Sequence, residues 1–513
     1  MNAIVKENVD LEAPFDLLVV GGGINGVGIA RDAAGRGARV LLCEQHDLGA
    51  HTSSASTKLI HGGLRYLEYY DFKLVRKSLH EREILLAAAP HIIGPLRFVL
   101  PHDRHLRPAW MIRTGLFLYD HLVRRRVLPD SRSVDLRRHP AGQPLDRRYT
   151  KGFLYSDAWV DDARLVVLTA RDAAEHGARI LTRARCVGLR RDGERWSAVL
   201  EHADGRRSNV MARAVVNAAG PWVAQFLDDA SPVKPRHHPR MIKGSHIVVP
   251  RLYEHDYAYL FQAPDGRVVF AIPFAGDYTL IGTTERDYTG DLAVPKIDEP
   301  EIDYLLEMAN RYFARTLSRA DVTWTFAGLR PLLTSSTADP KSVTRDYVLE
   351  LDDGAAPLLS VYGGKLTTYR RLAQDVVDML APRLGIAGPH WTERATLPGG
   401  DLPRADFTAF AARMAGQYPW LPDPLRLRYA RAYGTRMTRM LTHCRGLPDL
   451  GEEILPGLYA LEVQYLRREE WAQTAEDILW RRSKLGLRLP RDSEGLLDAW
   501  IAAHPPEPSV TVA

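Results

Sequence analysis

A short apolar run that ends in closely spaced glycines constrains this chain more than any other feature. Leu17 to Val20 predicts a buried parallel strand, and it leads into the pattern Gly21-x-Gly23-x-x-Gly26. Residues 24–35 predict a helix, and a second apolar run ends in Glu44, eighteen residues after Gly26. A strand, glycine turn, helix, strand and acid in this order indicate a dinucleotide site. A glycine cluster alone often only makes a turn, so the inference depends on the complete order.

Each part of this pattern has a physical task. The first glycine allows a tight turn, the second lets the backbone approach a pyrophosphate, and the third lets the helix pack closely on the strand. The helix N-terminus favours the phosphate charge, and Glu44 can accept hydrogen bonds from ribose hydroxyls. The residues of the turn that we predict to contact the cofactor are Gly21, Gly23, Ile24, Asn25 and Gly26.

Length and composition limit the remaining alternatives. A chain of 513 residues predicts two or three domains, and 45% hydrophobic with 26% charged residues is typical of a folded globular protein. A net charge of +5 does not by itself indicate nucleic acid. The three cysteines are far apart and form neither a metal-ligand spacing nor a disulfide framework. We therefore expect no metal, and we expect the protein to lie in a reducing cytoplasm. The charged N-terminus lacks a signal-peptide core, and no apolar run approaches the roughly 20 residues that span a bilayer.

A hydroxyl-rich segment follows Glu44 and leads to Gly62-Gly63 and Arg65. It suits a solvated loop or a helix N-cap. It also suits a loop that folds over the cofactor, and we predict contacts from Thr52, Ser53, Ser54, Ser56, Lys58, Leu59, His61, Gly62 and Gly63.

Three later strand ends carry similar small or polar residues. Residues 215–217 run into a turn with Ala219, Gly220 and Trp222, and residues 322–327 run into Gly328 and Arg330. Residues 358–362 repeat the strand, glycine turn and helix order. We predict cofactor contacts there from Gly363, Gly364, Lys365, Leu366 and Thr367.

The rest of the chain divides by pattern. Strand signals over 241–282 predict an antiparallel sheet in a separate substrate domain, and Pro- and Gly-rich residues 382–400 predict a linker. Helices expected at 407–417, 424–433, 457–468 and 470–485 form a small α domain without obvious chemistry. The predicted division is 1–85, 151–230 and 331–385 for a discontinuous cofactor domain, 86–150 and 231–330 for the substrate domain with a basic insert, and 386–513 for the C-terminal domain.

The basic insert stands out by charge. Residues 97–126 contain seven arginines and two aspartates, a net +5 equal to that of the whole chain, interleaved with Trp110, Phe117, Tyr119 and other apolar residues. This composition fits a surface that lies on anionic lipid.

Several longer motifs resemble one family. They are Gly-Gly-Gly-Ile-Asn-Gly at 21–26, the stretch 52–68 around His-Gly-Gly-Leu-Arg-Tyr, Arg-Pro-Ala-Trp-Met-Ile-Arg at 107–113, and the stretches 157–165, 242–248, 328–332 and 363–370. Together they resemble the respiratory, FAD-dependent sn-glycerol-3-phosphate dehydrogenases of the bacterial aerobic type. The resemblance covers most of the chain, including the C-terminal domain.

The resemblance implies a fold and a reaction. The fold class is α/β: a Rossmann-type FAD-binding domain, a D-amino-acid-oxidase-like substrate domain on an antiparallel sheet, and a C-terminal α-helical cap. The implied reaction oxidises glycerol 3-phosphate to dihydroxyacetone phosphate, with electrons passing from FAD to a membrane quinone. The implied location is the cytoplasmic face of the inner membrane, on an anionic membrane surface. The oligomeric state, a homodimer included, stays open.

The resemblance also implies roles in the substrate pocket. Arg65, Arg330 and Arg345 match pocket-lining positions, with Tyr66 beside them, and an arginine fork suits a phosphate. A base for the hydroxyl proton should titrate near neutral pH, which makes His246 and His61 candidates, with Lys365 as a polarising group. The sequence does not choose among them.

Other functions remain open on the same residues. A glycerol-3-phosphate oxidase would pass the electrons to oxygen and make peroxide. A flavin amine or amino-acid oxidase would need one carboxylate anchor, whereas several arginines suit a dianion. The basic insert also permits an RNA-binding flavoprotein, but no nucleic-acid fold signature supports it, and no nucleic acid is expected.

Overall fold

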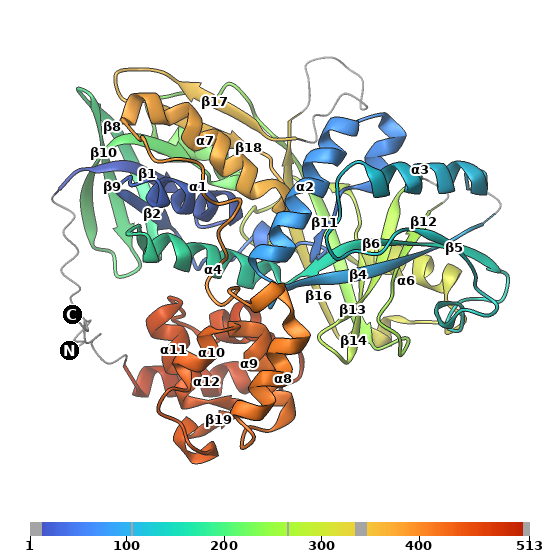
Figure 1. The fold of residues 1–513 in the computed structure, drawn as a ribbon. Coiled ribbons are helices and arrows are strands. Elements are labelled where there is room, and N and C mark those ends of the chain that lie inside the picture. The colour runs from blue at the N-terminus through green and yellow to red at the C-terminus, as the bar shows by residue number, and fades with distance from the viewer. Residues whose placement is uncertain (1–12, 104–105, 264–265, 334–345, 506–513) are drawn as a thin grey trace.

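The computed structural model describes residues 13–103, 106–263, 266–333 and 346–505. Within them the chain builds two large sheets that lie side by side, and a helical C-terminal domain lies below the first sheet and its helices (Figure 1).

The first sheet has eight strands and carries the glycine turn. Its central strands run parallel in the order β18-β10-β1-β2-β7, with β17 antiparallel at one edge and β8 and β9 attached through β10. The strands are β1 (Phe15–Val20), β2 (Val40–Glu44), β7 (Arg179–Thr182), β8 (Ala184–Asp192), β9 (Arg195–His202), β10 (Arg207–Asn217), β17 (Val348–Asp352) and β18 (Leu358–Tyr362).

Helices cover this sheet because its central strands are apolar on both faces. One buried cluster joins β1, β2 and β18 to the helices α1 (Ile24–Gly35), α4 (Asp162–Glu175) and α7 (Tyr369–Leu384). A second cluster on the opposite face includes residues of α5 (Val223–Ala230). This is the expected α/β arrangement around a nucleotide turn.

The second sheet has ten strands and is largely antiparallel. Its order is β15-β11-β14-β13-β12-β4-β6-β3, with β16 on β11 and β5 on β6. The strands are β3 (Leu59–Ile60), β4 (Ile93–Pro101), β5 (Arg132–Asp135), β6 (Lys151–Val160), β11 (Arg240–Pro250), β12 (Ala258–Gln262), β13 (Val268–Phe274), β14 (Tyr278–Gly282), β15 (Arg286–Asp287) and β16 (Trp324–Leu332).

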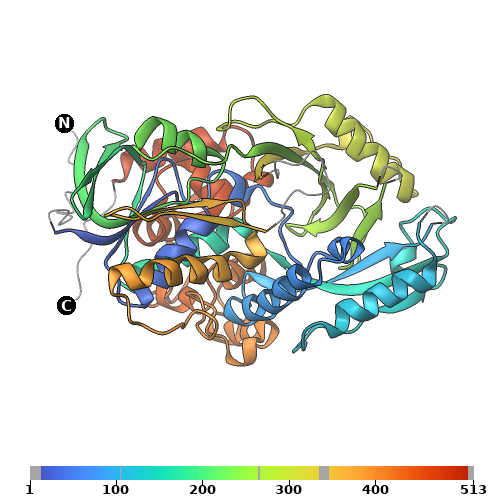
Figure 2. The same cartoon turned by 90° about the horizontal axis from the view of Figure 1, so that it is seen from above.

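Helices lie on both faces of the second sheet as well. The helix α6 (Glu299–Tyr312) packs on one face, and α2 (Phe72–Ala88) and α3 (Ala109–His121) pack on the other. Seen from above, α2 and α3 lie next to each other along one side of the molecule (Figure 2). The predicted basic insert is therefore mainly β4, α3 and the segment that follows it.

The sheet pairing corrects one boundary of the predicted division. Residues 151–160 were assigned to the cofactor domain, but they form β6, which pairs with β4 from Ile93↔Val160 to Pro101↔Gly152. The short strand β3, also assigned to the cofactor domain, pairs with β6. The paired residues are between 51 and 67 positions apart in the sequence. The local pattern of apolar and polar residues therefore could not show which sheet the strand joins.

The C-terminal domain has its own apolar core. Its helices are α8 (Phe407–Gln417), α9 (Asp423–Tyr433), α10 (Arg436–Met440), α11 (Ala460–Glu469) and α12 (Ser493–Ala503), with a small hairpin of β19 (Glu453–Leu455) and β20 (Leu458–Tyr459). The helix expected over 470–485 is shorter in the structure: residues 475–476 are α-helical and Asp477–Arg482 form a π-helical segment. Three charged residues of this segment, Asp477, Arg481 and Arg482, are buried.

Candidate functional site: a nucleotide and substrate cavity

Two glycines let β1 turn directly into α1. Gly21 has a φ of +114°, and a Cβ there would lie 2.5 Å from the main-chain oxygen of Ala218 at the end of β10. A Cβ on Gly26 would lie 1.9 Å from the oxygen of Gly21. No other residue fits these close approaches. The N-terminus of α1 therefore opens at the carboxyl ends of β1 and β10, where its amides favour an anion.

Glu44 fastens this turn. Its Oε2 accepts a hydrogen bond from the Gly22 amide at 2.6 Å, and its Oε1 accepts one from the His46 amide at 2.7 Å. Burial raises the pKa of Glu44 above its usual range, and these amide bonds act in the opposite direction. Glu44 lines the cavity, and its remaining lone pairs could accept hydrogen bonds from a ribose.

The loop over residues 52–63 lies against the turn. Ser53 Oγ accepts from the Ile24 amide at 3.0 Å, and Thr52 Oγ1 donates to the Leu329 oxygen at 2.8 Å. Ser56 and Lys58 have a structural role, because the Ser56 hydroxyl and the Lys58 ammonium both bond to the buried carboxylate of Asp162. The predicted cofactor contact of Lys58 is therefore replaced by a buried ion pair.

The second glycine turn meets the first. Asn25 Nδ2 donates to the Gly363 oxygen at 3.1 Å, and the His61 amide donates to Thr367 Oγ1 at 3.3 Å. Segments more than 300 residues apart thus enclose one space.

That space is a cavity of about 1160 Å³ between the two sheets. Most predicted residues line it: Gly21, Gly23, Ile24, Asn25, Glu44, Thr52, Ser53, Ser56, Leu59, His61, Gly63, Arg65, Tyr66, Ala219, Gly220, Trp222, His246, Gly328, Arg330, Gly363, Gly364, Lys365, Leu366 and Thr367. Four predicted residues lie behind the wall instead: Gly26, Ser54, Lys58 and Gly62. Arg345 lies outside the described residues.

One end of the cavity gathers the predicted catalytic groups. His246, on β11, is buried, stacks on Phe326, and shares a 3.0 Å hydrogen bond between Nε2 and Thr57 Oγ1. Its Nδ1 has no hydrogen-bond partner among the described residues. Burial, together with the charges of Lys58 and Arg330, holds the pKa of His246 well below its usual range, so the ring is neutral near pH 7.

Cations surround this end. The buried Lys365 ammonium lies 4.1 Å from the centre of the Tyr66 ring and has no hydrogen-bond partner among the described residues. Arg65 lines the same cavity and pairs with no described residue. Arg330 donates to the Thr284 oxygen at 3.2 Å and lies 3.4 Å from the carboxylate of Glu285. The cavity thus offers positive charge with free donors.

The sequence-based prediction missed an aromatic wall. Phe98 stacks on Tyr155 with ring centres 5.0 Å apart, and Phe270 lies edge-on to Phe98 and to His61. All of these rings line the cavity. Phe98 and Phe270 lie in apolar stretches of their strands β4 and β13, and an apolar stretch does not distinguish a cavity wall from a core.

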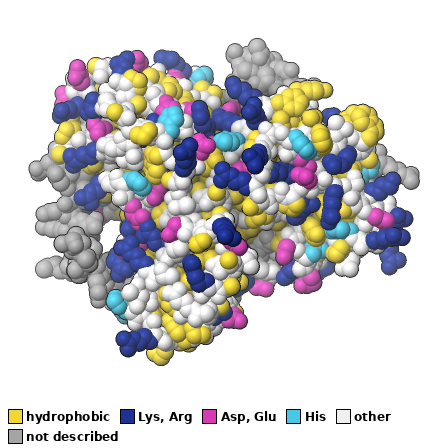
Figure 3. Space-filling view, viewed as in Figure 1, with side chains coloured by type: hydrophobic (Ala, Val, Ile, Leu, Met, Phe, Trp, Pro, Cys, Tyr) yellow, Lys and Arg dark blue, Asp and Glu magenta, His cyan; other side chains and the backbone are white. Residues whose placement is uncertain are grey.

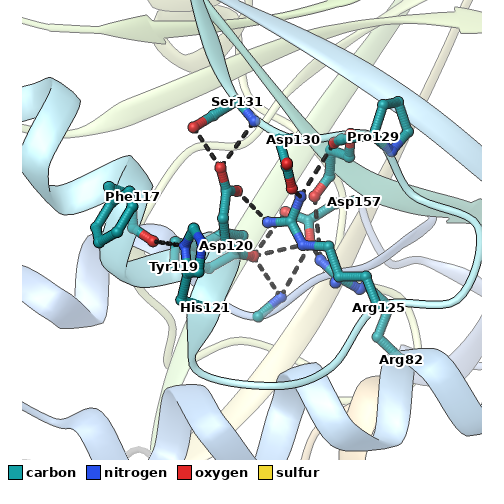
Figure 4. A network of polar contacts seen from close by, with 12 residues as sticks. Arg82, Phe117, Tyr119, Asp120, His121, Arg125, Pro129, Asp130, Ser131 and Asp157 are labelled. Carbon is teal, nitrogen blue, oxygen red and sulfur yellow. Dashed lines mark hydrogen bonds and ion pairs between the residues drawn. The ribbon is translucent and has the colours of Figure 1, made fainter.

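It also missed a buried polar network behind Gly62 (Figure 4). The cavity-lining carboxylate of Asp157 accepts from Arg82 at 2.7 Å and from the Tyr119 hydroxyl at 2.8 Å. The Tyr119 hydroxyl in turn accepts from the Gly62 amide at 2.8 Å. Burial and the Asp157 charge raise the pKa of Tyr119 well above its usual range, so it stays a donor. Asp157 also opposes the burial that lowers the pKa of His61.

Two family matches cover this architecture. Residues 16–370 match the family described as FAD dependent oxidoreductase, and residues 390–504 match the C-terminal domain of alpha-glycerophosphate oxidase. The chain belongs to the FAD-dependent oxidoreductase family.

Similar proteins agree with this assignment. A glycerol-3-phosphate dehydrogenase of Pseudomonas aeruginosa is 55% identical over 502 residues, 97% of each chain. A D-erythritol 1-phosphate dehydrogenase of Brucella abortus is 50% identical over 94% of this chain and 97% of its own. The crystal structure of a glycerol-3-phosphate dehydrogenase from Bacillus halodurans with FAD has a TM-score of 0.76 at 29% identity, covering 96% of this chain and 91% of that one.

The residues present fit FAD as the cofactor. A Cβ would fill the close approaches at Gly21 and Gly26, and the N-terminus of α1 opens on the cavity. The buried Oδ1 of Asn25 has no partner among the described residues and is available to a ligand. The cavity is lined both by Glu44, on β2 of the first sheet, and by His246, on β11 of the second sheet. Within the described ranges, no group of three or more His, Cys, Asp or Glu residues could hold a metal ion.

Proposed function

We propose that this protein oxidises sn-glycerol 3-phosphate to dihydroxyacetone phosphate and passes the electrons to a membrane quinone. The observation that carries the proposal is the unpartnered, buried ammonium of Lys365, which faces no described acceptor in a cavity that also holds Arg65, Arg330 and a neutral His246. Names of relatives at 48–55% identity support the choice of alcohol.

Oxidation of the C2 alcohol removes a hydride from carbon and a proton from oxygen. FAD, when bound, supplies the hydride acceptor. His246 is the base that we assign to the hydroxyl proton, because the ring is neutral and one nitrogen is free of described partners. When Nε2–H donates to Thr57, Nδ1 carries the lone pair that accepts the proton.

The phosphate requires an anchor that stays charged. Lys365, Arg65 and Arg330 together provide three cations for a dianion. A buried ammonium without a partner is costly, so a phosphate oxygen that pairs with Lys365 gains more than it would at the surface. His61 lines the same cavity with its pKa lowered by burial, and we keep it as the second candidate for the base.

The test is anaerobic mixing of the holoprotein with each substrate while the flavin absorbance is followed. We expect glycerol 3-phosphate to bleach the flavin without NAD, and glycerol to do so only poorly. Equal bleaching by glycerol would refute the phosphate anchor. Because one relative acts by name on D-erythritol 1-phosphate, this four-carbon ester is the necessary third arm. If kcat/KM is higher for D-erythritol 1-phosphate than for glycerol 3-phosphate, the four-carbon ester is the substrate instead.

The acceptor needs a separate experiment. Peroxide yield during steady-state turnover, with and without a soluble quinone analogue, distinguishes the two electron acceptors. We expect quinone to raise the turnover rate and suppress peroxide. Rapid turnover in air with stoichiometric peroxide, unchanged by quinone, would indicate the oxidase instead.

Use of a lipid-dissolved quinone requires contact with a bilayer, and α3 supports such a surface. Trp110 and Phe117 are 68% and 51% exposed, and Met111, Leu118 and Val127 are exposed nearby. In Figure 3, hydrophobic and basic side chains stand side by side over this part of the molecule. Among the described residues, no helix is long and apolar enough to cross a membrane. We therefore propose attachment to the cytoplasmic face of the inner membrane.

The predicted membrane surface is revised at three residues. Tyr119 is fully buried in the network behind Gly62, Arg125 pairs with the buried Asp120, and Arg97 donates to Ser156 Oγ at 2.9 Å. Arg104 lies outside the described residues. Arg124 and Arg126 of the predicted stretch keep side chains that pair with no described residue. They line a groove between α2, residues 122–126 and residues 393–396, together with three further basic side chains that pair with no described residue, namely Lys73, Arg76 and Arg394.

Sedimentation with vesicles tests this attachment. We expect binding to anionic vesicles that weakens with salt, since each basic residue near an anionic surface contributes about 1 kcal/mol. Changing Arg124 and Arg126 to Gln should weaken binding, whereas changing the paired Arg125 should not act through lipid contact. Binding that ignores lipid charge, salt and these changes would refute the surface.

A further inference from the structure

The loop after β2 forms the nucleotide end of the cavity. Glu44, Gln45, His46, Gly49, Ala50 and His51 all line it. Asp47 belongs to the same loop but does not line the cavity, and it is only 2% exposed. A buried carboxylate needs partners, and those of Asp47 come from the other end of the chain.

Two adjacent arginines of the C-terminal domain hold Asp47. Arg481 Nε donates to Oδ2 at 2.6 Å, Arg482 Nη1 donates to Oδ2 at 2.6 Å, and Arg482 Nη2 donates to Oδ1 at 2.8 Å. Both arginines are buried. They lie in the π-helical segment Asp477–Arg482, and such segments are frequent at functional sites.

A second connection joins the same two parts. Asp477 pairs with Arg183 Nη2 at 2.7 Å, and the Arg183 amide donates to the His46 oxygen at 2.9 Å. Burial acts to raise the pKa of Asp477, but the charges of Arg183, Arg482 and Arg481 hold it below its usual range. His46 then bonds to His51, whose ring lies edge-on to Trp222. The C-terminal domain is thus bonded to both sides of the loop.

We propose that Arg481 and Arg482 are positioning residues for FAD, through which the C-terminal domain keeps the loop 44–51 in the form that binds the adenosine end of the cofactor. The inference goes beyond the proposed reaction. It rests on the FAD site and not on the identity of the alcohol or of the electron acceptor.

The apparent Kd for FAD depends on the fraction of molecules in which the loop 44–51 is formed. Glu44 orders the Gly22 amide only when the loop is formed, and Asp47 lies three residues further on. If loss of the Asp47 bonds lowers the competent fraction to about one tenth, the apparent Kd for FAD rises about tenfold. Turnover at saturating FAD should not change, because neither arginine lines the substrate end of the cavity.

The test compares Asp47→Asn with Arg436→Gln. Arg436, on α10, pairs with Glu175 at the end of α4, so it also joins the first sheet's helices to the C-terminal domain. Apoprotein of each variant is titrated with FAD, and the quenching of flavin fluorescence gives Kd. We expect a rise of about tenfold or more for Asp47→Asn and of less than about threefold for Arg436→Gln.

Two results would overturn the proposal: a wild-type Kd for Asp47→Asn, or an equal rise in both variants, which would assign the effect to general loosening of the domains. If Asp47→Asn does not fold, Arg481→Gln serves instead. It removes one of the three bonds to Asp47 and should raise Kd by a smaller factor, again with unchanged kcat at saturating FAD.

Hydrogen exchange provides a readout that is independent of activity. Because coupling between two sites is reciprocal, FAD should slow amide exchange in residues 473–485 of the C-terminal domain. The protection should disappear in Asp47→Asn and persist in Arg436→Gln. Exchange in 473–485 that ignores FAD in the wild-type protein would contradict the coupling.

Discussion

Replacing Lys365 by Met separates binding from stability. The Lys365 ammonium is buried without a hydrogen-bond partner among the described residues, and its contact with the Tyr66 ring contributes about 2 kcal/mol. Met keeps the apolar stem and removes the unpaired charge, whose desolvation opposes folding. These effects offset one another, so we expect the free energy of unfolding of the substrate-free protein to change by less than about 1 kcal/mol.

The same change should strongly reduce catalysis. A charge-assisted hydrogen bond to a phosphate oxygen contributes about 1.5–3 kcal/mol, so its loss lowers kcat/KM for glycerol 3-phosphate about 10- to 150-fold. The assay is steady-state turnover with a quinone analogue, alongside urea denaturation of the same sample.

Lys58→Met is the matched control. Its ammonium donates to both oxygens of Asp162 and to the Ser54 oxygen, each at 2.9 Å. Removing it leaves a buried carboxylate without its cation, which costs about 3–5 kcal/mol. We therefore expect Lys58→Met mainly to lower the free energy of unfolding and Lys365→Met mainly to lower kcat/KM. A Lys365→Met variant with normal kcat/KM, or one destabilised as much as Lys58→Met, would refute the assignment of a free ammonium.

Three further predictions concern single side chains. Arg330→Lys should raise the activation free energy derived from kcat/KM by about 1–2 kcal/mol, because the guanidinium fork is lost but 41% of the side chain is exposed. An unchanged kcat/KM would remove Arg330 from the site. His246→Gln should slow flavin reduction by roughly 10²–10⁴-fold in stopped-flow measurements. It should also abolish the acidic limb of the pH profile, which lies below the usual histidine range because burial lowers the pKa of His246, and a near-normal rate would move the role to His61 or Lys365. Burial, with Arg164 and Arg431, lowers the pKa of His91 to about 3, so the unfolded chain binds the extra proton between about pH 6.5 and 3 and stability falls as the pH falls. His91→Leu should reduce that slope by up to about 1.4 kcal/mol per pH unit in urea denaturation between pH 7 and 5, and an unchanged slope would contradict a buried neutral ring.

The parts of the site that the sequence predicts are those whose function depends on the local backbone. In the turn at 21–26, Gly21 and Gly26 stand where a Cβ would clash with nearby main chain. The glycines in the sequence are therefore enough to predict this close approach. The turn at 363–367 is recognisable in the same way. Lys58 is different, because a lysine in a pocket motif suits a phosphate equally well until Asp162, more than 100 residues away, is known to hold it.

Tyr119 illustrates a second limit. On sequence it belongs with Trp110 and Phe117 in an apolar and basic stretch, and all three suit a membrane surface. Helical spacing places Tyr119 on the opposite side of α3 from the exposed rings, where its hydroxyl joins Gly62 to Asp157. Only the tertiary packing shows which side of this helix meets the sheet and which side is exposed.

The C-terminal domain has no obvious chemistry in its sequence because charged pairs such as Arg481 and Arg482 usually mark a solvated surface. Burial changes that interpretation. A buried guanidinium without a carboxylate costs several kcal/mol, so two adjacent buried arginines require an acid that is itself held in place. Asp47 is that acid, and it lies three residues after Glu44, whose carboxylate accepts from the Gly22 amide. The arginines therefore reach low energy only when the nucleotide loop is formed, and the loop is most stable when the C-terminal domain is docked.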